Sequence, residues 1–159
     1  MFGLSSSSSY AVLALSSLSR AGDAWILARN LAAAIDAPLP YLSKILHGLA
    51  GVGMVEAKRG YRGGFRLLRD ADQLTVGEIV IAVEGPAFLE GCLLGKAECS
   101  DRRACPAHAF WGLERERIRS QLQRMTLAEV AEFERKAGRG LKLPVKAPPK
   151  TAAVRSRQR

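Results

Sequence analysis

The chain has 159 residues, of which 48% are hydrophobic and 25% are charged. This composition is typical of one folded domain with appendages. Apolar stretches such as residues 76–83 are too short to span a bilayer, and no Lys or Arg precedes Arg20, so the positive segment of a signal peptide is absent. We therefore expect a cytoplasmic protein that does not enter a membrane.

The formal net charge of +9 comes from one end of the chain. Nine basic and no acidic residues lie in residues 135–159, so the remainder is neutral. We expect this basic tail to be disordered, and either to add non-specific affinity for DNA or to be inert. Within the neutral part, residues 44–69 carry six basic residues against Glu56 alone. This block is a candidate phosphate-binding face, with an ordinary solvated surface as the alternative.

The first third of the chain predicts three helices. Serines offer N-caps for a helix over about residues 7–19, and apolar spacing predicts a second helix over residues 25–35. Pro38 ends the second helix and Pro40 lies in the first turn of the third. The core-facing residues of the third helix are Leu42, Ile45, Leu46, Leu49 and Val52. Two helices joined by so short a turn indicate a helix-turn-helix, which we assign to a DNA-binding domain over residues 1–86.

The third helix and the hairpin after it supply the predicted DNA contacts. On the helix these are Tyr41, Ser43, Lys44 and His47. Residues 54–58 and 65–68 are predicted strands, joined by a turn that needs positive φ at Gly60, Gly63 and Gly64. Such a hairpin is the wing of a winged helix-turn-helix. At its tip, Arg59 and Arg62 can grip phosphates or enter a narrow minor groove.

Local capping signals predict the later helices. Thr75–Glu78 and Thr126–Glu129 both have the Thr-x-x-Glu pattern of a capping box. Between the helices that they start, Pro106 begins a long helix with an apolar stripe that runs to about Arg124. We assign residues 109–134 to this dimerisation helix and a short closing helix; the alternative is that the long helix closes its own core. The predicted fold is mainly α with a small β-hairpin.

All three cysteines lie in residues 87–108, which we expect to form a ligand-bearing loop. Cys92, Cys99 and Cys105 are followed by His108. Thiolate and imidazole bind zinc, copper and iron–sulfur centres, and an odd number of cysteines in a reducing compartment fits a metal or redox site better than disulfides. A structural Cys3His zinc site uses the same ligands, although the Cys-x2-Cys knuckles of zinc modules are absent. Three inert or merely oxidisable thiols are the third interpretation.

Four longer motifs join these features. They are Tyr-Ala-Val-x-Ala-Leu in the first helix, Pro-x-x-Tyr-Leu-x-Lys-Ile-Leu in the third, Gly-x-Val-x-x-x-Arg-Gly-x-x-Gly-Gly-Phe-x-Leu in the hairpin, and Thr-Val-Gly-Glu-Ile-Val-x-Ala-Val-Glu-Gly after it. Together with three cysteines before a long helix, they resemble the IscR/NsrR/RirA-type winged-helix iron–sulfur regulators. The resemblance covers residues 4–133.

The resemblance implies a homodimeric transcription factor that binds a palindromic operator in double-stranded DNA and senses iron–sulfur, iron, nitric oxide or redox status. It implies an iron–sulfur cluster on Cys92, Cys99 and Cys105, with His108 at the fourth-ligand position of the IscR type. The first cysteine gap is one residue longer than in that type. The NsrR type uses an N-terminal carboxylate instead, where this chain has Ser9. The ligand set favours a 2Fe–2S over a 4Fe–4S cluster.

An enzyme is not expected. Apart from the capping boxes, the sequence contains no nucleophile–base pair, phosphate-binding glycine loop or paired carboxylates, so no small-molecule substrate is expected either. The rival class is a winged-helix regulator or adaptor with a structural zinc site and no cluster sensing. A salt-dependent shift of DNA separates DNA binding from an adaptor role.

Overall fold

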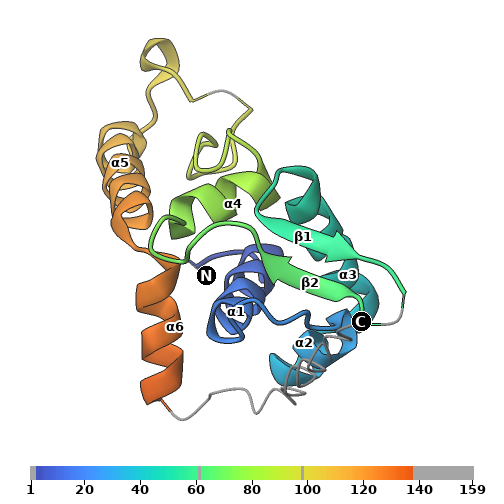
Figure 1. Ribbon diagram of the computed structural model, residues 1–159. Helices are drawn as coiled ribbons and strands as arrows, with labels where there is room; N and C mark the ends of the chain where they lie inside the picture. Colours follow the sequence, from blue (N-terminus) through green and yellow to red (C-terminus); the bar gives the residue numbers. More distant parts are fainter. Residues whose placement is uncertain (1–2, 61, 98, 138–159) are drawn as a thin grey trace, which may run out of the picture.

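The computed structural model describes residues 3–60, 62–97 and 99–137 (Figure 1). Within them the fold is mainly helical with one two-stranded antiparallel hairpin, as the sequence predicted. In chain order the elements are α1 Ser6–Arg20, α2 Ala28–Ala34, α3 Leu39–Gly51, β1 Val55–Lys58, β2 Gly64–Leu67, α4 Val76–Glu84, the short 3-10 turn Asp101–Arg103, α5 His108–Arg124 and α6 Leu127–Lys136. The tail from residue 138, predicted to be disordered, lies outside the described residues.

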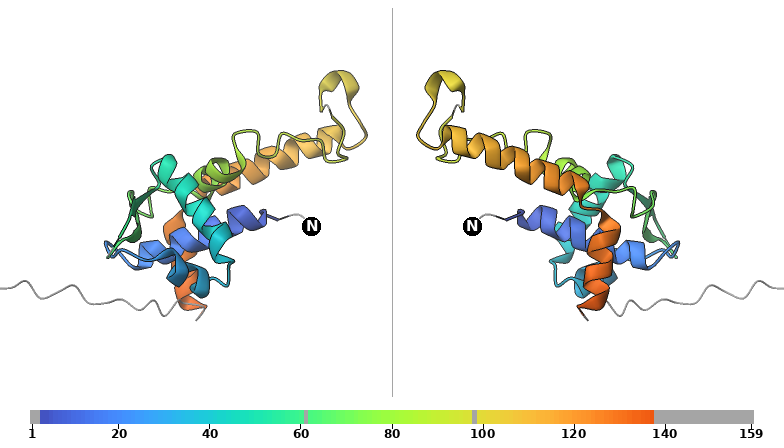
Figure 2. Two further views of the ribbon diagram at one scale, coloured as in Figure 1. Left: turned by 90° about the vertical axis from the view of Figure 1, so that its right-hand side faces the viewer. Right: turned by 90° about the vertical axis from the view of Figure 1, so that its left-hand side faces the viewer.

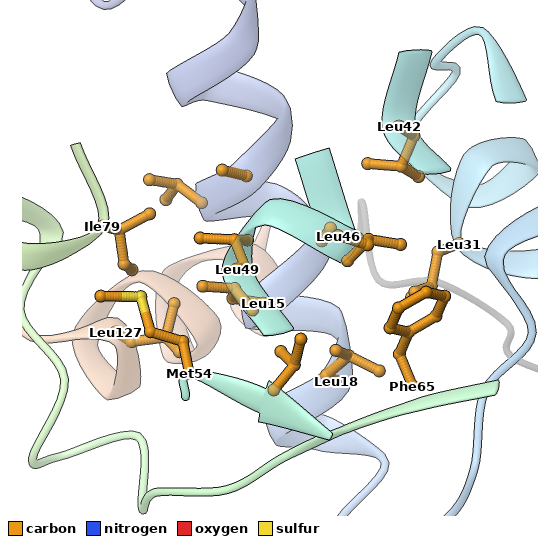
Figure 3. Packing of buried hydrophobic residues seen from close by; sticks show 14 of the residues in the cluster. Leu15, Leu18, Leu31, Leu42, Leu46, Leu49, Met54, Phe65, Ile79 and Leu127 are labelled. Atoms are coloured by element: carbon orange, nitrogen blue, oxygen red, sulfur yellow. The ribbon is translucent and has the colours of Figure 1, made fainter. Parts of the chain in front are cut away.

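One apolar core holds α3 and the hairpin against α1 (Figure 3). Its largest fully buried side chains include Leu15, Leu18, Leu46, Leu49 and Leu127. The predicted core positions of α3 are confirmed for Leu42, Leu46 and Leu49. Val52 was predicted to be buried and is 59% exposed, because α3 ends at Gly51 and the helical spacing stops there.

The second helix begins later than predicted. It starts at Ala28 rather than residue 25, because Ile26 pairs with β2 as a short extended segment. The Ile26 N–H donates to Phe65 O at 3.0 Å, and the Phe65 N–H donates to Ile26 O at 2.8 Å. This pairing links the hairpin to the chain between α1 and α2 and so orients the wing against the helix-turn-helix.

The hairpin turn differs from the prediction at one glycine. Gly60 and Gly64 have φ of +88° and +141°, but Gly63 does not have positive φ, whereas Arg62 does, at +64°. Space is what Gly63 provides: a Cβ there would lie 2.1 Å from the Lys58 carbonyl oxygen. The close approach of the two strands therefore requires a residue without a side chain.

Both capping boxes form as predicted, at Thr75 for α4 and Thr126 for α6. The two N-termini also pair with each other. The Val76 N–H donates to Met125 O at 2.8 Å, and the Leu127 N–H donates to Leu74 O at 2.8 Å. This pairing joins α4 to the α5–α6 corner.

The α5 helix extends away from the rest of the fold, with the cysteine loop at its far end (Figure 2). The hairpin lies on the other side of the molecule (Figure 1). On α5, Phe110 is 59% and Leu113 is 66% exposed, whereas Leu122 and Met125 at its other end pack against the core of their own chain. None of the described helices has the length and apolar character needed to cross a membrane.

Candidate functional site

The predicted contacts on α3 lie on its outer side. Lys44 and His47 are exposed, Tyr41 is 42% exposed and Ser43 is half-buried. Tyr41 is also tied to α1, because its hydroxyl is hydrogen-bonded to that of Ser7 and its ring stands edge-on to Tyr10. These two contacts fix the position of the Tyr41 ring against α1.

The His47 ring has a defined orientation. Its Nδ1 lies 2.7 Å from Ser43 O, and a carbonyl oxygen can only accept, so Nδ1 carries the proton. The ring also stands perpendicular to that of Phe65, with centroids 5.3 Å apart. In the neutral imidazole, Nε2 is then a hydrogen-bond acceptor.

The outer face of the hairpin carries more cations than the two arginines predicted. Arg59 and Arg62 lie exposed in the turn, as expected. The Lys58 ammonium lies 5.5 Å and the Arg66 guanidinium 4.8 Å from the Trp25 ring centroid, and both distances allow a cation–π contact. Sequence reasoning missed Trp25 because it assigned that residue to a helix.

The cysteine loop carries three partly exposed thiols whose electrostatic environments differ. Backbone N–H groups of Lys96 and then Leu94 lower the pKa of Cys92, because they stabilise its thiolate. Burial, and next the neighbouring Cys92 charge, raise the pKa of Cys99. The loop thus differentiates its thiols chemically.

His108, the first residue of α5, faces the thiols. Its Nδ1 lies 3.5 Å from Cys99 Sγ, and its Nε2 lies 2.9 Å from Asp101 Oδ1. A carboxylate on one ring nitrogen leaves the other free to bind a metal, which is the usual arrangement around ligating histidines. Asp101 was not singled out from the sequence, since the 3-10 turn that carries it has no periodic signal.

Trp111 and Arg115, which lie one and two turns beyond His108, face the same loop. The Trp111 indole N–H donates to Gly91 O at 2.8 Å. Arg115 Nη1 donates to Glu90 O at 2.9 Å and lies 3.5 Å from Leu89 O. The Arg115 side chain turns onto the loop, where the backbone carbonyl groups accept its protons. The spacing from His108 was the available signal.

The thiols and the imidazole of this site are suitable ligands for a soft metal centre, but the structure does not place them around a common point. In the described ranges, no group of three or more His, Cys, Asp or Glu side chains is placed so that it could hold a metal ion as it stands. The described ligand side chains therefore have to move to surround a bound centre.

Comparison with known proteins identifies the family. Residues 4–132 match the model of the Rrf2 family, described as iron-dependent transcriptional regulators. The chain belongs to the Rrf2 family. A relative named an HTH-type transcriptional regulator in Aquifex aeolicus is 34% identical over 117 residues, which cover 72% of this chain and 78% of the relative. The protein is therefore a DNA-binding transcriptional regulator and not an enzyme.

Other relatives carry more specific names. The transcriptional regulator IscR of Photobacterium profundum is 35% identical over 92 residues, which are 58% of this chain and 53% of that relative. This Rrf2-family chain therefore matches about half the length of the IscR relatives. Solved structures share the fold: CymR of Bacillus subtilis has a TM-score of 0.69 at 22% identity, covering 84% of this chain and 98% of its own. IscR of T. potens has a TM-score of 0.68 at 21% identity, covering 86% and 90%.

Proposed function

We propose that this Rrf2-family regulator binds an iron–sulfur cluster through Cys92, Cys99, Cys105 and His108, and that the cluster controls its binding to DNA. The observation that carries the proposal is the gathering of these side chains. The three cysteines lie in one loop, and His108 Nδ1 lies 3.5 Å from Cys99 Sγ. The IscR name of relatives at 35% identity supports the same cofactor.

The donor set defines what the site can offer a cluster. Three thiolates and one imidazole make the bound centre less negative and more oxidising than four thiolates do. The hydrogen bond to Asp101 keeps the His108 ring oriented and leaves Nδ1 for the cluster. When bound, the cluster supplies a redox-active and labile iron centre. This ligand set favours a 2Fe–2S cluster.

The DNA-binding half of the proposal places α3 in the major groove and the hairpin beside it. The proposed helix contacts are Tyr41, Ser43, Lys44 and His47, and the wing contacts are Arg59 and Arg62. We propose that two copies associate through the outer part of α5, because Phe110 and Leu113 there are exposed. A twofold dimer reads a palindromic operator.

The deciding experiment is purification without oxygen, followed by an absorption spectrum and iron and sulfide assays. A coloured protein with near-equal iron and sulfide, and colour lost in His108→Ala or any single Cys→Ala variant, supports the cluster. One zinc per chain without colour would instead assign a structural Cys3His site, which the donor set also suits. Unchanged operator binding by the triple Cys→Ala variant under all iron and oxygen conditions would refute cluster control.

A further inference from the structure

The backbone just before Cys92 is held by side chains of α5. The carbonyls of three consecutive residues, called here the 89–91 segment, face Trp111 and Arg115 through the contacts of 2.8, 2.9 and 3.5 Å described above. The 89–91 segment is therefore anchored to the same helix that carries His108.

These anchors share one face of α5 with the proposed histidine ligand. His108, Trp111 and Arg115 are spaced i, i+3 and i+7, which places them in one row along the helix. Cys92 follows the 89–91 segment directly in the chain. The row therefore ties the first thiol ligand to the helix that presents the imidazole, although 15 positions of the loop separate them in sequence.

The interactions are of the kind that can hold a loop. Trp111 is 9% exposed, and its indole N–H needs a partner in this environment. The Arg115 guanidinium is always charged, and charge-assisted hydrogen bonds are stronger than neutral ones. The segment also contains Leu89 at φ +69°, a conformation that a leucine adopts only where its surroundings enforce it.

We propose that Trp111 and Arg115 are positioning residues of the cysteine site. They fix the 89–91 segment on α5 and so set where Cys92 lies relative to His108. The inference rests on the proposed function, since it concerns the ligands of the proposed cluster. The inference also connects cluster binding with the helix proposed to form the dimer. If Cys92 moves when the cluster binds, the hydrogen bonds of Trp111 and Arg115 transmit that movement to α5.

The first test uses the full-length, metal-free, reduced protein. Arg115→Met removes the donors and keeps the stem, and Trp111→Phe removes the indole N–H and keeps an aromatic ring. The matched control is Arg119→Met, which removes a partly exposed arginine of the same helix whose described partner is Glu116. Alkylation of Cys92 by a bulky maleimide, followed by peptide mass spectrometry, should become about tenfold faster in Arg115→Met. Arg119→Met should react at the parent rate.

The second test measures the rate of iron loss from the loaded protein to a chelator. Arg115→Met should lose iron faster, Arg115→Lys should recover part of the difference, and Arg119→Met should match the parent. Thermal melting shows whether each variant is folded. If Arg115→Met is unfolded, the rates of Trp111→Phe decide whether the inference holds. Parent-like alkylation rates in both folded variants would overturn the inference. If the parent takes up no iron and sulfide, the proposed function fails by itself, and the alkylation rates still decide whether these residues position Cys92.

Discussion

Individual side chains on α3 are suited to different parts of DNA. With Nδ1–H donating to Ser43 O, neutral His47 offers Nε2 as an acceptor. In the major groove, acceptors pair with the exocyclic amino groups of adenine and cytosine. Lys44 carries a compact charge on a flexible stem, which suits a phosphate. His47 is therefore expected to read a base and Lys44 to contribute sequence-independent affinity.

Replacing these two residues should separate the two roles. His47→Ala should cost about 1–3 kcal/mol of operator affinity and relax the preference at one position, whereas Lys44→Ala should weaken all sequences alike. The measurement is fluorescence anisotropy at fixed salt, with an operator selected from random DNA and its single-base variants. Arg119→Met, which removes a cation on α5, is the control. Equal weakening of all sequences by His47→Ala would contradict base reading.

A second residue-scale feature links α4 to α1. The Glu84 carboxylate accepts hydrogen bonds from the hydroxyls of Ser5 and of buried Ser8, the latter at 2.7 Å. These bonds, first that of Ser5 and then that of Ser8, lower the pKa of Glu84 below its ordinary 4.5. A carboxyl group whose pKa is lower in the folded chain stabilises the fold above its unfolded pKa. That contribution is lost as the pH falls through the folded value.

We therefore expect Glu84→Gln to be less stable than the parent by about 1 kcal/mol at pH 7. The difference in stability should shrink as the pH is lowered below 4.5, because the Glu84 carboxyl group of the parent then becomes protonated and is uncharged, like the amide of the variant. Urea unfolding at a series of pH values measures this. Asp23→Asn, in the exposed turn after α1, is the control. A difference that stays constant down to low pH would refute the role of the charge.

At the scale of elements, the sequence predicted helix starts correctly where local residues set them, and wrongly where a contact distant in sequence set them. The Thr75 and Thr126 capping boxes act within four residues, and both helices start where they predicted. The start of α2 was misplaced because Ile26 pairs with Phe65, which lies 39 positions later and has no signature in a local window. The cysteine site follows the same rule. Its proposed ligands were chosen by residue type, but the contact of Asp101 with His108 follows only from the loop fold.

The hairpin is the element whose loss should affect function most selectively. A Cβ on residue 63 would meet the Lys58 carbonyl oxygen at 2.1 Å, so Gly63→Ala must open the turn that carries the wing arginines. Operator affinity should fall by about tenfold, as expected for losing one or two phosphate or groove contacts. The helical circular dichroism should stay near that of the parent.

The control for this variant is Gly51→Ala at the exposed end of α3, where nothing lies within 4 Å of an added Cβ. Parent-like DNA binding by Gly63→Ala would mean that the wing does not contribute. A loss of helical signal would instead show that the hairpin supports the core, which its Phe65 contact makes possible. Filter binding and far-ultraviolet spectra on the same samples distinguish these results.

At the scale of the whole molecule, the two proposed sites lie on opposite sides and are connected through α5. The cysteine loop sits at the outer end of α5, and the hairpin lies on the opposite side of the molecule (Figures 1 and 2). The inner end of α5 meets α4 through the paired N-termini of α4 and α6. Under the proposed function, we expect a change in the loop to reach the DNA-binding half through the setting of α5, which in a dimer also sets the spacing of the two recognition helices.

The exposed stripe of α5 tests this arrangement. Leu113 is 66% exposed and Phe110 is 59% exposed one turn before it. If the stripe is the dimer contact, Leu113→Glu removes the burial of one leucine per copy and adds a charge at the interface, which should weaken association by tenfold or more. Because a palindromic operator needs both recognition helices, operator affinity should fall with it, while the iron and sulfide content per chain should remain unless the partner supplies a ligand.

Sedimentation velocity over a range of concentrations gives the association state, and Arg119→Gln supplies the control, since it changes the net charge by the same amount on another side of α5. A dimer that survives Leu113→Glu would exclude this stripe as the interface. Loss of both the dimer and the cluster would show that the site is completed between two chains. Loss of the dimer alone would place all the ligands within one chain, in which His108 Nδ1 lies 3.5 Å from Cys99 Sγ.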